Sequence, residues 1–348
     1  MSDSSRYILW FEDFGMDALP RVGGKNASLG EMTRVGIRVP PGFAVTTDAY
    51  KDFLTHTGIQ EEIRSRLAGV NPDDLESLES VSHEIRELMS RAPVPGAIEQ
   101  AILATYERLC ERCGVPDLPV AVRSSATAED LPGASFAGQQ ETTLWVLGGV
   151  RVLIRTLTCW SSLFTPRAIS YRIKMGFPHE LVHISVGVQK MANACTAGVM
   201  FTLNPRNGDR SKIAIEGSWG LGESVVAGLV TPDAYLVDKV TFDILQSTLS
   251  PKLTEYVVCQ DESRNTHVEM QDVPADRQTM ACMSDAEITE LARLGKRIER
   301  HYGRPMDIEW AIDADLDFPE NVTILQARPE TVWSQKKAVP VLKPRDRR

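Results

Sequence analysis

The stretch that most constrains the fold covers residues 120–143 and reads VAVRSSATAEDLPGASFAGQQETT. Its first three residues are apolar and predict a buried strand, and Arg123 follows directly. Most of the remaining residues are small, hydroxylic or glycine. A packed core would not use such a run, and a disordered linker would not follow a core strand directly and contain Phe136. The sequence therefore predicts an ordered loop whose backbone approaches something closely.

The chemistry of this loop suits an anion. Glycine permits close approach because it has no Cβ atom, and hydroxyl and backbone N–H groups suit phosphate oxygens. Arg123 adds a planar, permanently charged fork for the same anion. A Ser/Thr-rich surface loop fits the composition equally well, so composition alone leaves both interpretations open.

Length and charge narrow the class of protein. The 348 residues suggest two domains, or two lobes of one module, and 43% hydrophobic residues are enough for a large core. The net charge of −9 argues against nonspecific nucleic-acid binding, so a bound anion needs local positive charge. No apolar stretch reaches membrane-spanning length, and the N-terminus lacks the features of a signal peptide. We therefore predict a cytoplasmic protein without a nucleic-acid or membrane partner.

The cysteines and histidines do not have the spacing of a metal site. Cys110 and Cys113 form a single CxxC pair, whereas a structural zinc site needs four ligands. We expect free thiols here, and structural or solvated roles for the six scattered histidines.

A second glycine-rich segment lies near the N-terminus. Gly23 and Gly24 predict a turn that enters a helix running from Asn26 to about Val35. Lys25 would then lie where backbone donors and a cation can both face phosphate. The spacing is not that of a Walker A loop, because Leu19 and Asn26 stand at two of its required positions. Alone, this segment is better explained by a surface lysine.

Periodicity predicts the other elements. We expect strands at residues 7–14 and 43–45, a helical cover without catalytic residues at about 48–113, and helices at 150–164 and 166–175. Residues 182–191 and 198–203 alternate and are predicted to pair as a hairpin. Further expected elements are a strand at 213–216 that ends in Glu216, a strand at 232–237 and an amphipathic helix at 284–302.

The last motif covers residues 306–329 and predicts two strands of a hairpin. Asp307 and Glu309 lie two residues apart, as do Gln326 and Arg328, so each pair faces one side of its strand. Carboxylates together with an amide oxygen are ligands suited to Mg²⁺ that bridges nucleotide phosphates. A merely solvated face explains these residues less well, because apolar residues flank them on both strands.

Five segments together resemble one known family. They are GGKNASLGEM, residues 120–142, GVMFTLNP, EGSWGLGESVVAG and the DIEW…ILQARPET pair. In this order they resemble the nucleotide-binding domain of phosphoenolpyruvate synthase, pyruvate phosphate dikinase and rifampin phosphotransferase, over residues 7–332. The resemblance implies an α+β, ATP-grasp fold with ATP held between two lobes. We expect these lobes at residues 1–188 and 189–333, followed by a flexible basic tail at 334–348.

The resemblance also implies roles for individual residues. Lys25 and Arg123 match ligands of the ATP phosphates, and Arg328 matches a second phosphate clamp. Gly138 and Thr142 match a loop that closes over the phosphates.

Four more residues match nucleotide or metal positions of this family. Gln189 matches a residue near adenine, and Glu309 and Gln326 match Mg²⁺ ligands, with Asp307 beside them. Glu216 lies in a matching motif without a definite role.

The family's reaction implies a further component. The γ-phosphate of ATP passes to water and the β-phosphoryl group to a histidine in a TSHAA-like motif, which leaves AMP and phosphate. That motif does not occur in these 348 residues. We therefore expect an enzyme component that needs a partner subunit or domain carrying the histidine.

The final acceptor stays open at this point. The stand-alone ATP-binding subunit of phenylphosphate synthase is a family member of this kind, which favours phenol. A phosphoenolpyruvate synthase-like or rifampin phosphotransferase-like domain or fragment with another acceptor, and a non-catalytic nucleotide sensor, are the alternatives.

Overall fold

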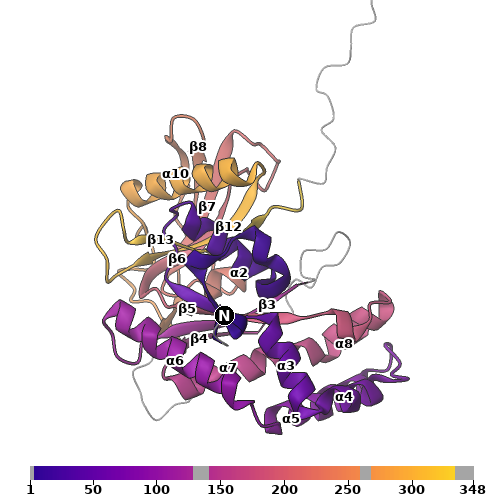
Figure 1. Ribbon diagram of the computed structural model, residues 1–348. Coiled ribbons are helices and arrows are strands. Elements are labelled where there is room, and N and C mark those ends of the chain that lie inside the picture. The colour runs from indigo at the N-terminus through magenta and orange to yellow at the C-terminus, as the bar shows by residue number, and fades with distance from the viewer. Residues whose placement is uncertain (1–3, 128–140, 259–267, 334–348) are drawn as a thin grey trace, which may run out of the picture. The chain divides into compact units, whose positions relative to one another are not determined.

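The computed structural model describes residues 4–127, 141–258 and 268–333, which divide into two compact units (Figure 1). The first unit holds the described residues up to Asn193, together with 256–258, 268–271 and 323–326. The second holds residues 194–255, 272–322 and 327–333. The boundary predicted after residue 188 lies inside a strand of the first unit.

The first unit is built on a five-stranded sheet in which all neighbouring strands are antiparallel. The strand order is β1 (Ile8–Trp10), β2 (Gly42–Val45), β5 (Ile184–Lys190), β3 (Val120–Ala126) and β4 (Thr142–Val146). Residues 7–14 are predicted as one strand, but Tyr7 ends a short helix, and only β1 is extended before the 3-10 helix η1 (Phe11–Asp13).

Helices cover both faces of this sheet. On one face lies α2 (Leu19–Arg34), which contacts β3 and β5. The helices associated with the other face are α3 (Thr47–Thr57), α4 (Ile59–Leu67), α5 (Leu75–Arg91), α6 (Gly96–Cys113), α7 (Gly149–Ser161) and α8 (Pro166–Lys174), and they confirm the predicted helical cover and the two helices after it (Figure 1). Trp160 lies in their core, with its ring 5.1 Å from that of Phe53. Short segments in this unit are α1 (Ser4–Tyr7) and the 3-10 helices η2 (Met16–Ala18), η3 (Ser162–Phe164) and η4 (His179–Leu181).

The second unit contains most of a six-stranded sheet with one helix along it. The strand order is β13 (Val322–Pro329), β12 (Met306–Asp313), β6 (Ala194–Phe201), β7 (Lys212–Trp219), β8 (Asp233–Asp238) and β9 (Ile244–Thr248). The amphipathic helix α10 (Asp285–Tyr302) contacts β7, β8 and β12, and its apolar side is buried. Its first turn is closed by a capping box between Ser284 and Glu287. Elsewhere, β10 (Thr254–Val258) pairs with β11 (Val268–Asp272), and α9 (Glu223–Val226) is a single turn.

The predicted hairpin of residues 182–191 and 198–203 is wrong. Both segments are strands, but β5 pairs with β2 and β3, whereas β6 pairs with β12 and β7 in the other sheet. The physical reason is that β5 lies inside its sheet, with β2 paired along one edge and β3 along the other. Neither edge of β5 is left for β6, and its residues from Ile184 to Gln189 are all buried.

A buried ion pair stabilises the second unit. The side chains of Lys252 and Asp233 are both 0% exposed, and Nζ lies 2.7 Å from Oδ1. The same carboxylate accepts hydrogen bonds from the backbone N–H groups of Ser250 and Cys282. Asp233 therefore joins three segments that are distant in the sequence.

We expect Lys252→Met to lower the free energy of unfolding by about 3–5 kcal/mol, because it leaves a buried carboxylate without its cation. Urea denaturation measures the loss. Lys174→Met is the matched control, since the Lys174–Asp73 pair is 52% and 76% exposed and should be worth about 1 kcal/mol or less. Equal losses in the two variants would contradict this role of the buried pair.

Candidate functional site

The predicted turn at Gly23 is a kink within α2. Gly23 has φ +72°, and helical segments lie on both sides of it, so the helix begins before the predicted Asn26. A Cβ atom at Gly23 would lie 2.2 Å from the carbonyl oxygen of Ser125 in β3. Only glycine fits this position, since both the left-handed backbone and the close approach exclude a side chain. The kink places Lys25 at the start of the second helical segment.

Asn26 fastens that segment to the sheet. Its backbone N–H donates to Ser125 Oγ at 3.3 Å, and its side-chain amide donates to Val22 O and to Ser185 Oγ. Gly187 makes room for this amide, because a Cβ atom there would lie 2.3 Å from Asn26 Oδ1. Asn26 is only 2% exposed, so it positions the neighbouring Lys25 rather than facing a ligand itself.

The strand register gathers three predicted ligands on one face of the five-stranded sheet. Arg123 lies opposite Thr142 on β4 and opposite Gly187 on β5, while Gln189 lies opposite Ala121. Directly opposed residues in a sheet share a face, and so do residues two apart. Arg123, Thr142 and Gln189 therefore point to the side on which α2 packs.

Gln189 lies in a part of this face with small neighbours. It is 3% exposed and donates from Nε2 to the carbonyl oxygen of Pro40 at 3.3 Å. Across the sheet it stands opposite Gly42 and Ala121. A Cβ atom at Gly42 would lie 2.7 Å from Cε2 of Phe11, so this part of the face is closely packed.

Arg123 holds the part of β13 that belongs to the first unit. Its Nη1 donates to the carbonyl oxygen of Leu325 at 3.2 Å, and its Nη2 donates to Oε1 of Gln326 at 3.0 Å. The structure thus brings together a predicted phosphate ligand and a predicted metal ligand from positions 203 residues apart. An amide oxygen has two lone pairs, so this bond leaves Gln326 one for a cation.

The carboxylates of β12 lie in the second unit. Asp307 and Glu309 are half-buried and alternate with the buried Ile308 and Trp310, which confirms the predicted period of two. Asp307 Oδ2 accepts hydrogen bonds from Arg328 at 2.9 Å from Nε and 2.8 Å from Nη2. Burial raises the pKa of Asp307 and outweighs the opposing effect of Arg328. Arg328, predicted as a phosphate clamp, is thus paired with a predicted metal neighbour.

Glu216 joins the same face of the six-stranded sheet. Glu309 lies opposite Val199 on β6, and Val199 lies opposite Glu216 on β7, so the three residues form one row across the sheet. The predicted strand end at Glu216 is wrong, because β7 continues to Trp219. The alternation of Ile213 and Ile215 predicts that Glu216 points to the opposite face of its strand. That Glu216 lies in the same row as Glu309 could not be predicted without the order of the strands.

Two predicted features lie outside the described residues, namely Gly138 and the tail at 334–348. Within residues 4–127, 141–258 and 268–333, no group of three or more His, Cys, Asp or Glu residues is arranged to hold a metal ion. The predicted set of two carboxylates and one amide is smaller than such a group, although its oxygen donors fit Mg²⁺. No helix in the described part of the chain is long and apolar enough to cross a membrane.

A family profile described as "Pyruvate phosphate dikinase, AMP/ATP-binding domain" matches residues 19–348. The chain belongs to this family. Membership and the two α+β units confirm the predicted ATP-grasp class. A solved structure of D-alanyl-alanine synthetase A from Vibrio cholerae is similar over 72% of this chain and 62% of its own, with 10% identity and a TM-score of 0.20.

Curated relatives of this dikinase domain are much longer than the chain. A probable phosphoenolpyruvate synthase of Staphylothermus marinus is 46% identical over 95% of the chain and 42% of its own length. Phosphoenolpyruvate synthases of Aeropyrum pernix and Neisseria meningitidis are each 44% identical, over 97% and 96% of the chain and 44% and 43% of their own lengths. The chain thus spans less than half the length of these relatives and corresponds to their dikinase-type ATP-binding domain.

We expect Gly23→Ala to lower the melting temperature more than Gly58→Ala does. Both glycines have φ near +70°, but nothing lies within 4 Å of a Cβ atom at Gly58, whereas one at Gly23 would strike Ser125. Gly58→Ala should cost only the left-handed backbone, about 1–2 kcal/mol. Scanning calorimetry of both variants isolates the cost of the close approach. Equal shifts would show that α2 can move away from β3 without loss.

Proposed function

We propose that this chain is the ATP-binding component of a dikinase-type phosphotransferase that converts ATP to AMP and phosphate. The observation that carries the proposal is the pair of hydrogen bonds from Arg123 to Leu325 and Gln326. They fix the guanidinium on the face that also bears Thr142 and Gln189. Family membership supports nucleotide binding by this chain.

Three cations would contact the polyphosphate. Lys25 follows the kink that packs α2 on the sheet, and Arg123 lies on the face to which α2 is fastened. Arg328 is 53% exposed, so it can reach an anion while its stem stays in place. Fixed cations stabilise charge that develops on a transferring phosphoryl group without reorganising during the reaction. Gly138 and Thr142 are proposed to close over these phosphates, and Gln189 to contact the nucleotide near adenine.

Mg²⁺ is the proposed cofactor, held by Asp307, Glu309 and Gln326. When bound, the metal ion offsets negative charge on the phosphate oxygens. The residues themselves supply oxygen donors, and the ion pair with Arg328 favours the charged form of the Asp307 carboxylate against the effect of burial. Glu216, in the same row as Glu309, adds negative charge to this face.

We further propose that the β-phosphoryl group passes to a histidine on a partner subunit or domain and then to an acceptor. The names of the relatives favour pyruvate as that acceptor, because they are phosphoenolpyruvate synthases. The sequence interpretation favours phenol, with phenylphosphate as the product. A rifampin phosphotransferase-like domain with another acceptor and a nucleotide sensor without turnover are the remaining alternatives.

Arg123→Ala should weaken the binding of ATP with Mg²⁺ about 10- to 150-fold, since it removes charge-assisted hydrogen bonds worth about 1.5–3 kcal/mol. Arg123→Lys keeps the charge but loses the fork, so its affinity should lie between the two. Arg91→Ala is the control, because Arg91 is 76% exposed on α5 and pairs only with Glu87 among the described residues. Titration calorimetry that finds equal affinity for wild type and Arg123→Ala would refute the phosphate role.

A labelling experiment tests the reaction. The chain is incubated with [β-³²P]ATP, Mg²⁺ and the proteins that copurify with it, and we expect AMP together with acid-labile protein label, as phosphohistidine gives. A chase with phenol or with pyruvate should release that label as phenylphosphate or phosphoenolpyruvate and so identify the acceptor. ATP binding without AMP or label would refute the dikinase reaction and favour the sensor.

A further inference from the structure

The first unit contains a cavity of about 430 Å³ on the helical side of its sheet. It is lined by residues of α3 and α4 and by a segment that runs from η3 to β5, and no predicted nucleotide or metal ligand is among them. Its volume lies in the usual range for small-molecule sites. The full lining consists of Tyr50, Lys51, Leu54, Thr55, Gln60, Ile63, Arg64, Leu67, Ala68, Phe164, His179, Glu180, Val182 and His183.

Much of the wall is apolar. Ile63, Leu67, Phe164 and Val182 are buried side chains of the helical core, and Leu54 packs against that core. A hydrocarbon group placed against them would leave water without leaving a polar group unpaired. The wall therefore suits a ligand with an apolar body.

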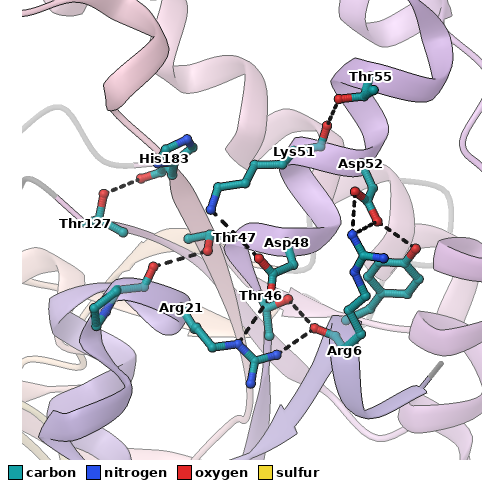
Figure 2. Close-up of polar contacts among 12 residues, drawn as sticks. Arg6, Arg21, Thr46, Thr47, Asp48, Lys51, Asp52, Thr55, Thr127 and His183 are labelled. Atoms are coloured by element: carbon teal, nitrogen blue, oxygen red, sulfur yellow. Dashed lines mark hydrogen bonds and ion pairs between the residues drawn. The ribbon is translucent and has the colours of Figure 1, made fainter. Parts of the chain in front are cut away.

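Two cations stand at the exposed part of the lining. Lys51 is 45% exposed and Arg64 is 67% exposed. Their acidic neighbours are at loose distances, with Asp48 3.8 Å from Lys51 and with Glu61 and Glu180 3.8 and 3.7 Å from Arg64. Figure 2 shows Lys51 reaching from α3 toward Asp48. These contacts are longer than hydrogen bonds, so a carboxylate ligand can compete for both cations.

A third cation lies behind the wall. Arg172 is 1% exposed, donates from Nε to His179 Nδ1 at 2.7 Å, and lies 5.6 Å from the ring centre of Phe164. No carboxylate in the described part of the chain pairs with it, and its buried Nη1 has no hydrogen-bond partner there. A buried guanidinium without a counter-ion favours an anion nearby, because its positive charge is poorly screened.

The imidazole of His179 adds a donor rather than a charge. Burial and the neighbouring Arg172 lower its pKa to about 4, so the ring is neutral near pH 7. Since Nδ1 accepts from Arg172, the ring proton is carried by Nε2. Neutral N–H donors beside cations suit an acceptor-only group, and a carboxylate is such a group.

We propose that this cavity binds a small amphipathic carboxylate, whose hydrocarbon part lies against the apolar wall and whose charge pairs with Lys51 and Arg64. A neutral amphiphile would gain nothing from these cations, and an inorganic anion would gain nothing from the apolar wall. The site is independent of the proposed ATP site, since the two share no residue.

Octanoate is the probe. 1-Octanol has a similar hydrocarbon part without the charge, and acetate has the carboxylate without the long hydrocarbon part. In titration calorimetry with the full chain, octanoate should bind with a stoichiometry of one. The affinity for 1-octanol should be about tenfold lower, because it lacks the charge, and acetate should not bind measurably. Equal affinity for octanoate and 1-octanol would overturn the assignment of an anion, and absence of octanoate binding would overturn the site.

Substitutions in the lining test whether octanoate binds in this cavity. The double change Lys51→Met and Arg64→Met should weaken octanoate about tenfold and leave 1-octanol unchanged. Lys174→Met and Arg91→Met remove exposed, paired cations outside the lining and should change neither affinity. Thr55→Trp, at an exposed position of the lining, should abolish binding of both probes by filling the space.

Octanoate binding that survives Thr55→Trp would place the probe elsewhere and overturn the proposal. Circular dichroism and ATP titration of the same variants should match wild type, because the lining shares no residue with the proposed nucleotide site. The two proposals can therefore fail separately.

Discussion

The close approach of α2 to the five-stranded sheet is the constraint on which the first unit depends. It requires a glycine at position 23 above the backbone of Ser125, and a second glycine at position 187 to admit the amide of Asn26. Because positions 23 and 187 carry no side chain, α2 can lie directly on β3 and β5. The result is a rigid junction between a helix and a sheet, which is where a cation such as Lys25 can be held against a polar face.

The two faces of the same sheet carry different kinds of side chain, because successive residues of a strand point to opposite faces. On β3, Val120 and Val122 enter the helical core, whereas Arg123 and Ser125 face α2. One face is therefore apolar and builds the core and the cavity, and the other carries the polar residues. A shift of one residue in register would exchange the faces and bury Arg123 in the core, so hydrophobic burial fixes the polar face.

The sequence predicted what depends on local pattern. The amphipathic pattern in residues 284–302 and the alternation in 306–313 each predict an element and its buried side, and the structure confirms both. Strand partners are not local, so β5 and β6 were wrongly joined although each was identified. The row of Glu309 and Glu216 was missed for the same reason, since it exists only through the intervening β6. Family motifs supplied the candidate ligands that no periodicity could identify.

The two arginines of the proposed site differ in what holds them. The acceptors of Arg123 in β13 are a carbonyl and an amide oxygen, which orient the guanidinium without neutralising it. Arg328 is held by the carboxylate of Asp307, which offsets its charge. A metal ion that draws on Asp307 would weaken that pair and leave more of the charge of Arg328 for phosphate. Metal and polyphosphate would then favour each other's binding at the proposed site.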